Sequence, residues 1–592
     1  MSARAMMARS DGPGAAPASR PVAGGDDGVS TPAEGAVLAA AILRRCDQLF
    51  AARQPWETHW AQVADHVLPR RAEIGGPPVV GDMRGRQLLD STGIHANELL
   101  AAALHGMLTN PATRWFQLDI AGIDDDALAD AARGWLAAAG DSLAEALEES
   151  NFATQAHELY LDLGCFGTGC LYLDETGGRL RFATRSLAEI AVAEDAFGAI
   201  DTVMRRFPFT ARQAVQAFGA AALGAKLREA AAREPDRPFS FIHAVFPSAD
   251  DVDGAPGGEG AAASRARYVS VYVCAEDRRV VSRGAYHEFP YMVPRWSKGT
   301  GEVYGRSPAM SALADMKALN EMCRTSLLSA QKAVDPPIML PDDGFVGKIA
   351  TSPGSINFYR AGAQDRIQPL PFAGDVRLGL EMEERRRQFI RAAFFVDQLR
   401  LAEGPQMTAT EVLQRTEEKL RLMGPVLGRL QSELLRPLIA RAFAILARLG
   451  RIAPPPAALR KAVGGRLRVD YTSPIARAQR ADETQAIGRV TQMAQPFMAA
   501  DPSLLDLIDA EKLIRHVAAR EGLPRGLLRD ERQLAGLRRR RAEEMTEAGA
   551  ALSGATRPGG APVEAPVGDP LLAMLRGGAS AAPVGPARGG AS

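Results

Sequence analysis

The stretch MTATEVLQRTEEKLRLMGPVLGRLQSELLRPLIARAFAILARL, Met407 to Leu449, decides the fold class of this chain. It begins with a capping box, in which the Thr408 hydroxyl accepts the Glu411 backbone N–H and the glutamate side chain returns to the Thr408 amide. Apolar residues then recur at steps of three and four or their multiples, as one face of an α-helix requires: Val412, Leu420, Met423, Leu427, Leu430, Leu434, Leu438, Ile445 and Leu449. The helix would be roughly 60 Å long, with bends at Pro425 and Pro437. Such a helix indicates an elongated or multi-subunit protein.

The length and composition of the chain indicate a large globular protein. Its 592 residues exceed the size at which a single core usually stops growing, so two to four structural regions are expected. Hydrophobic residues make up 46% and charged residues 24%, and no apolar run is long enough to cross a bilayer. The N-terminal residues MSARAMMARSDGPG lack the apolar core of a secretory signal. We therefore expect a protein that stays in the cytoplasm where it is made.

The formal net charge is zero, from 70 basic and 70 acidic side chains. Zero net charge argues against a tight general nucleic-acid binder, because such binding depends on an excess of Lys and Arg that neutralises phosphates. It is compatible with a channel, since each neutralised phosphate would add to the drag on a sliding duplex.

The cysteine and histidine patterns predict no metal site. The five cysteines are odd in number and widely spread: Cys46, Cys165, Cys170, Cys274 and Cys323. His59 and His66 could share a helix face, but no Glu motif lies between them. We expect reduced, mostly buried thiols and neither a metal nor another cofactor.

The element order predicts an α+β, mainly α-helical chain. Helices are expected at 38–67, 93–107, 127–150 and 152–162, and strands at 170–174, 180–183, 189–192, 240–247, 268–273 and 280–286. Residues 1–35 and 547–592 are rich in Ala, Gly, Pro and Ser and are expected to be disordered.

A helix, a small β module and a second helix are expected in the middle of the chain. Ser307 as N-cap and Pro308 as the first helical residue begin a helix of about 27 residues that stops at Asp335. Strand candidates at 338–340, 355–359 and 367–370 precede a helix at 375–399. Further on, LRVDYTSP predicts a strand, and helices are expected at 481–498 and 503–521.

Four separated segments, in chain order, resemble the head-to-tail connector, or portal, proteins of short-tailed bacteriophages: LLDSTGIHANELLAAALHGMLTNPATRWFQL, VPRWSKGTGEVYGRSPAMSALADMKALNEM, MTATEVLQR and LGRLQSELLRPLIARAF. The resemblance covers about Leu38 to Arg520 and implies a portal fold with wing, stem, clip and crown. The implied regions are a disordered arm (1–35), the wing (36–306), the first stem helix (307–335), the clip (336–374), the second stem helix (375–398), a channel loop (399–407), a long kinked helix returning to the wing (408–480), crown helices (481–546) and a disordered tail (547–592).

The resemblance implies one subunit of a ring, of twelve copies by family likeness, at one vertex of a phage head. The ring would be assembled in the host cytoplasm and reside in the virion. Double-stranded DNA would pass inward during packaging and outward on infection, with contacts to phosphates that do not depend on sequence. The implied partners are other copies of the chain, the major capsid protein, the terminase motor and the tail adaptor, with no membrane partner.

Candidate channel and docking residues follow from the implied regions. Arg400 is the strongest candidate for DNA contact, since the resemblance places its loop in the lumen; the others are Gln398, Gln406, Arg385, Arg386, Arg387, Arg391 and the run Arg538–Arg541. Glu381, Glu383 and Glu384 precede the stem arginines, so ion pairs explain those arginines about as well as phosphates do. The candidates for a docking surface on the clip are Asp342, Asp343, Phe345, Lys348, Tyr359 and Arg360.

No motif predicts an enzyme. The segment TGEVYGRS, Thr300 to Ser307, is similar to a phosphate-binding loop but has Thr300 in place of the first glycine and Arg306 in place of the lysine, which leaves a turn with a helix cap. The glycines Gly164, Gly167 and Gly169 come after a helix and before a strand, the reverse of a dinucleotide fingerprint. The carboxylate runs at 124–126 and 250–253 fall in polar loops. The alternatives are a phage nuclease or translocating ATPase, which turnover with metal and ATP would reveal, and a non-portal ring adaptor of the tail.

Overall fold

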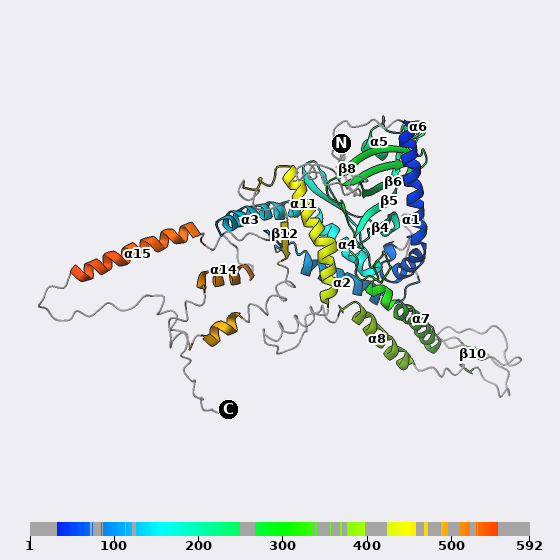
Figure 1. Cartoon of the computed structure of the whole chain (residues 1–592). Helices are drawn as coiled ribbons and strands as arrows, with labels where there is room; N and C mark the ends of the chain where they lie inside the picture. Colours follow the sequence, from blue (N-terminus) through cyan, green and yellow to red (C-terminus); the bar gives the residue numbers. More distant parts are fainter. Residues whose placement is uncertain are drawn as a thin grey trace, which may run out of the picture. The chain divides into compact units, whose positions relative to one another are not determined.

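Figure 1 shows the chain, whose computed structural model forms two compact units, Met1–Gly522 and Leu523–Ser592. The first unit runs from α1 (Pro32–Val67) to α14 (Ala510–Arg520), and the second contains α15 (Glu531–Gly554). The residues that the structure describes are 32–71, 74, 85, 87–112, 114–120, 126–248, 267–334, 338–339, 356, 368–369, 376–396, 423–456, 467–471, 487–494, 496, 509–520, 529 and 531–554.

Helices form the first part of the core. The 3₁₀ turn η1 (Pro69–Arg71) follows α1, and the next helices are α2 (Thr92–Leu108), α3 (Asp126–Glu148) and α4 (Phe152–Phe166). These four helices confirm the helices expected in this part of the chain. Helices α2 and α4 pack against each other around fully buried Leu100, Leu104 and Tyr160. Helix α1 begins at Pro32 and α15 continues to Gly554, so both helices extend into the ends expected to be disordered; the disorder of the remaining end residues stays a prediction.

Within the described residues, strands form four antiparallel sheets. The largest has the order β4-β5-β6-β7-β8, with β4 (Ile190–Glu194), β5 (Ile200–Thr210), β6 (Pro238–Pro247), β7 (Tyr268–Cys274) and β8 (Arg279–Tyr286). A three-stranded sheet has the order β3-β2-β9, with β2 (Leu171–Thr176), β3 (Arg179–Thr184) and β9 (Tyr291–Met292). A pair of strands joins β1 (Phe116–Ile120) to β12 (Leu467–Tyr471), which is the strand expected in LRVDYTSP. The sequence analysis missed β1, β5 and β9.

Helices cover both faces of the five-stranded sheet. Alternate residues of β6 point to opposite faces, as the period of two in a strand requires. Ile242 and Ala244 pack with Cys46 of α1, which runs along the sheet in Figure 1. Phe239 and Phe241 pack on the other side with α5 (Ala211–Phe218) and α6 (Ala225–Arg233). Among the described helices, none is long and apolar enough to cross a membrane.

A buried histidine lies between the five-stranded sheet and β9. The His243 ring hydrogen-bonds through Nδ1 to the Tyr291 hydroxyl at 2.8 Å and through Nε2 to the Ser270 hydroxyl at 3.0 Å. It also stacks on Tyr272, with ring centroids 4.1 Å apart. Burial, aided by the nearby positive charge of Arg205, lowers the pKa of His243 well below its ordinary value, so the ring is neutral in the folded chain.

Acid is expected to destabilise the fold through His243. Below pH 6.5 the unfolded chain protonates this residue and the folded chain does not, so the free energy of unfolding falls by about 1.4 kcal/mol per pH unit, or about 2 kcal/mol by pH 5. Urea unfolding of the wild type and of His243→Gln between pH 5 and 7.5 measures this. Burial raises the pKa of Asp162 to about 6 and gives an opposite slope, which cancels in the difference between the two proteins. Equal slopes in both proteins would contradict the prediction.

An antiparallel helical hairpin lies in the middle of the chain. Its helices α7 (Pro308–Val334) and α8 (Val376–Ala393) lie side by side in Figure 1. Ser307 caps α7, because its hydroxyl accepts the Met310 N–H at 2.9 Å and donates to the Cys165 carbonyl at 2.7 Å. Between the helices, β10 (Ile338–Met339) pairs with β11 (Gln368–Pro369). The order helix, β module, helix is confirmed, and the strand expected at 355–359 lies outside the described residues, apart from Ile356.

The long amphipathic helix is described from residue 423 onward. Residues 423–430 are helical and lead through a π-helical turn, η5 (Gln431–Leu435), into α11 (Arg436–Arg448). The described residues of the apolar stripe are buried inside this one chain, except for Leu449. Pro437 is the second residue after the π turn, so the missing proline N–H falls next to the place where the hydrogen-bond ladder changes register. The capping box, Val412 and Leu420 lie outside the described residues.

Candidate functional site

Three of the four hairpin arginines proposed for DNA contact form ion pairs within the chain. Arg386 pairs with Asp315 of α7. Arg387 donates to Asp90 at 2.9 Å and to Glu383 at 3.1 Å, and Arg391 donates to Glu384 at 3.0 Å. The alternative interpretation, ion pairs with the preceding glutamates, therefore accounts for Arg387 and Arg391, whereas Arg386 pairs with a carboxylate of the other helix that the sequence did not indicate.

Arg385 is different, because it is exposed and forms no ion pair with any described residue. Its guanidinium carbon lies 5.8 Å from the centroid of the Phe389 ring. Of the four arginines, Arg385 is thus the one whose charge remains available to a phosphate. Gln398, Arg400 and Gln406 lie outside the described residues, as do all six docking candidates of the clip, so DNA contact and docking stay predictions.

Removing Arg387 is expected to weaken the attachment of α8 to the body. Arg387→Ala would leave buried Glu383 and mostly buried Asp90 without their cation, at a cost of about 2 kcal/mol in the free energy of unfolding. Arg385→Ala is the matched control and should change that free energy by less than about 0.5 kcal/mol. Urea unfolding of both variants measures the difference. Equal losses would contradict the ion-pair assignment.

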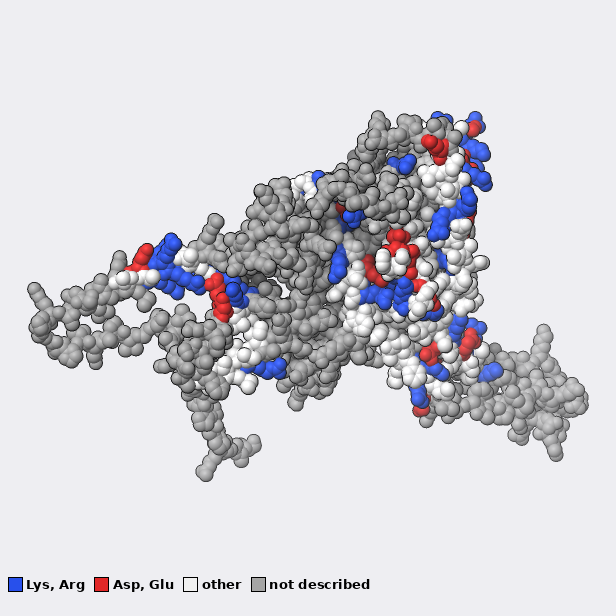
Figure 2. All heavy atoms as spheres, in the orientation of Figure 1, with Lys and Arg blue, Asp and Glu red and all other residues white. Residues whose placement is uncertain are grey.

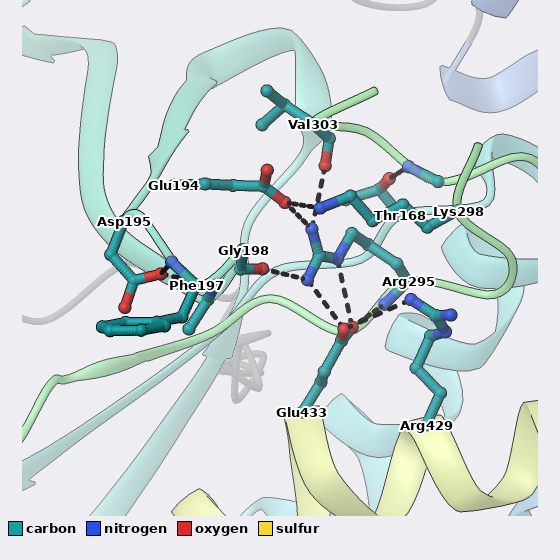
Figure 3. Close-up of polar contacts among 12 residues, drawn as sticks. Thr168, Glu194, Asp195, Phe197, Gly198, Arg295, Lys298, Val303, Arg429 and Glu433 are labelled. Atoms are coloured by element: carbon teal, nitrogen blue, oxygen red, sulfur yellow. Dashed lines mark hydrogen bonds and ion pairs between the residues drawn. The ribbon is translucent and has the colours of Figure 1, made fainter. Parts of the chain in front are cut away.

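A second polar cluster, drawn in Figure 3, centres on Arg295. The Arg295 side chain is only 3% exposed. Its backbone N–H and Nε donate to Glu433 Oε2 at 2.8 and 3.2 Å, and its Nη2 donates to Glu433 Oε1 at 2.7 Å. It also pairs with Glu194 at the end of β4. The two carboxylates hold the guanidinium from opposite sides and raise the pKa of Arg295, so that the charge persists despite burial.

The Arg295 cluster joins three distant parts of the sequence. Lys298 also pairs with Glu194, and Arg429 lies 3.7 Å from Glu433, so each carboxylate has a second cation. The Gly198 carbonyl accepts from Arg295 Nη2 at 3.0 Å. Because Glu433 belongs to the π turn, the cluster fixes the long helix against the β4–β5 turn and the segment after β9.

The two glycine-containing segments noted in the sequence pack against each other. Gly305 donates its N–H to the Thr168 hydroxyl at 2.8 Å, and a Cβ at Gly305 would lie 2.1 Å from the Gly167 carbonyl oxygen. Gly167 ends α4 with φ 74°, a conformation that favours glycine. Arg306 pairs with Glu302. The TGEVYGRS segment is therefore a turn with a helix cap, and its glycine serves close backbone packing.

Comparison with known proteins decides the family. The family model for "Bacteriophage head to tail connecting protein" matches residues 39–528. The chain belongs to this family. It is 32% identical over 524 residues to the probable portal protein of Bordetella phage BPP-1, covering 86% of this chain and 92% of that relative. It is 28% identical over 563 residues to the portal protein of Salmonella phage epsilon15, covering 92% of this chain and 98% of that relative.

The head-tail connector family agrees with the mainly α-helical α+β fold and makes the chain a portal-type component of a phage virion. Among solved structures, a chain of the virion of the native gene transfer agent particle is similar, with 14% identity and a TM-score of 0.31. The match covers 72% of this chain and 94% of that chain. The neck of the native particle with C12 symmetry is similar at 15% identity and a TM-score of 0.30, covering 72% and 94%.

The thiols of this head-tail connector lie inside the fold. All five cysteines are buried and unbonded, as expected from their spacing. Burial raises the pKa of each, to about 12 for Cys170 and about 11 for Cys274, so they remain protonated at neutral pH. Within the described residues, no group of three or more His, Cys, Asp or Glu side chains could hold a metal ion.

The described surface of the head-tail connector carries both signs of charge. Figure 2 shows Lys and Arg interspersed with Asp and Glu on this face, with basic side chains gathered on α15. That cluster includes the exposed run Arg538–Arg541 in the second unit. Its role in DNA contact stays a prediction.

Proposed function

We propose that this head-tail connector works as a closed ring of twelve copies whose central channel passes double-stranded DNA. The ring would sit at one vertex of the capsid and serve both packaging and ejection of the genome. The observation that carries the proposal is the surface of the α7–α8 hairpin, which keeps large apolar side chains exposed in the single chain.

The exposed apolar residues lie on more than one side of the hairpin. Leu327 and Val334 are seven residues apart and share one side of α7 at 100° per residue, with exposed fractions of 52% and 87%. On α8, Met382 and Phe389 share one side, whereas Leu380 lies opposite them. Large apolar side chains exposed together mark surfaces that associate with other proteins.

Two apolar sides suit a subunit that has a neighbour on each side. A two-fold dimer buries one self-complementary patch, whereas a head-to-tail contact uses two different patches and forms a ring when the rotation between copies closes. The hairpin would then be the stem, with residues 307–335 and 375–398 as its helices. The same reading makes 36–306 the wing, 399–407 the channel loop, 408–480 the return to the wing and 481–546 the crown.

The proposed partners follow from these regions. The clip, residues 336–374, would bind the terminase motor during packaging and the tail adaptor afterwards, and the wing would face the major capsid protein. Inside the channel, the solvent-facing charge of Arg385 supports transient contact with phosphates, and the loop residue Arg400 would add to it. The chain would have no catalytic role, so ATP hydrolysis would belong to the motor.

Negative-stain electron microscopy of the purified chain tests the proposal. Rings with a central hole are expected, and scattered monomers or compact dimers would contradict it. A parallel assay with ATP and divalent metal addresses the enzyme alternative, since turnover or cleavage of DNA by the purified chain would favour a nuclease or translocating ATPase.

A further inference from the structure

The turn between β4 and β5 displays an aromatic side chain to solvent. Phe197 is 95% exposed. The other aromatic among the exposed large apolar residues of the described chain, Phe389, is 47% exposed and lies near the Arg385 guanidinium. Figure 3 shows the Phe197 ring on the side of the turn away from Arg295. A phenylalanine makes almost no contact here that could explain its presence within a single chain.

The backbone of this turn is fixed by its own hydrogen bonds. Asp195 Oδ1 accepts the N–H groups of Phe197 at 2.8 Å and Ala199 at 2.9 Å. The Asp195 N–H donates to the Ala199 carbonyl at 2.8 Å, and Gly198 takes φ 82°, which favours glycine. The direction in which the Cα–Cβ bond of Phe197 leaves the turn is therefore set before any partner arrives.

The turn is also attached to the interior of the protein. The Gly198 carbonyl accepts from Arg295 Nη2 at 3.0 Å, and Arg295 is held by Glu194 and Glu433. A partner that binds Phe197 would thus contact a point that is rigidly connected to the long helix. Rigid presentation lowers the entropy lost on binding and raises affinity for a given contact area.

We propose that Phe197 is an anchor that inserts into an apolar site on the adjacent copy of this chain, an inference that rests on the proposed ring. Aromatic side chains that fill a partner pocket supply much of the energy of protein interfaces. Nucleic acid fits poorly as the partner, because the turn itself carries no basic side chain and the Lys298 ammonium beside it is paired with Glu194. The hairpin contact keeps the adjacent copy close, so the anchor meets its site at high effective concentration.

Mass photometry of the full chain across a dilution series tests the anchor. Phe197→Ser is expected to raise the concentration for half-maximal ring assembly by about tenfold or more, the loss expected for one buried phenylalanine. Ala196→Ser, on the same turn, is the matched control and should leave assembly unchanged. Asp195→Ala keeps the Phe197 side chain but removes the hydrogen bonds that fix the turn, so we expect an intermediate shift in the concentration for half-maximal assembly.

The outcomes separate this inference from the proposed function. If the wild type forms no ring, the proposed function fails; if Phe197→Ser assembles like the wild type, only the anchor fails. A photo-crosslinking amino acid in place of Phe197 should give covalent dimers of the chain in the purified ring. Crosslinks to capsid protein but not to a second copy, in assembled particles, would overturn the choice of partner. A lower melting temperature of monomeric Phe197→Ser would overturn the premise that the side chain is free.

Discussion

Replacing Glu433 by alanine is expected to lower the free energy of unfolding by about 3–5 kcal/mol, the cost of breaking a buried ion pair. The variant would remove three hydrogen bonds that Arg295 donates, although the Arg295 side chain is only 3% exposed. The buried guanidinium would then have Glu194 as its one remaining carboxylate among the described residues, and Lys298 also pairs with Glu194. Chemical denaturation of the purified chain, at one protein concentration for all variants, measures the loss.

Two controls show whether the effect comes from the Arg295 cluster. Glu433→Gln keeps an acceptor of the same shape and should lose less than the alanine variant. Arg429→Ala removes a partly exposed contact of 3.7 Å to the same carboxylate and should cost less than about 1 kcal/mol. A loss within 1 kcal/mol of wild type for Glu433→Ala would mean that Arg295 is satisfied by water or by Glu194 alone.

The hairpin could be predicted from the sequence because its signals are local. Ser307 and Pro308 occupy adjacent positions that define a helix start, and the hydroxyl of Ser307 caps the Met310 N–H as expected. The helix, the β module and the second helix then follow one another along the chain, so their order can be read from consecutive residues. The family resemblance, which rested on four segments of which one contains the start of α7, is confirmed by the family match over residues 39–528.

Strand β5 was missed because its charges are neutralised by residues outside the strand, 16 and 159 positions away. Arg205 pairs with Glu189, and Arg206 pairs with Asp47 of α1. These two arginines and Pro208 interrupt the apolar alternation that identifies a strand. Pro208 lies beyond the residues of β5 that pair with β4, where a strand tolerates proline.

The Arg295 cluster was equally hidden from sequence reasoning. Arg295 and Glu433 are 138 residues apart, and nothing local to either predicts the pairing. The π turn that carries Glu433 is also hidden, since the stripe of apolar residues at steps of three and four fits an ordinary α-helix. The stem arginines show the opposite case, because the glutamates beside them in the sequence did indicate the pairs with Glu383 and Glu384.

Placing carboxylates on the exposed apolar sides of the hairpin is expected to abolish ring assembly. In Leu327→Asp with Phe389→Asp, each side chain would lose about 1.5–3 kcal/mol of burial per subunit contact and add the desolvation of a charge, so half-maximal assembly should need about a thousandfold more protein or higher. Both side chains are about half exposed in the single chain, so the circular dichroism spectrum of the monomer should match wild type. Leu327→Met with Phe389→Leu keeps these sides apolar and should still form rings. If the double aspartate variant assembles at wild-type concentrations in mass photometry, the hairpin does not form the contact between copies.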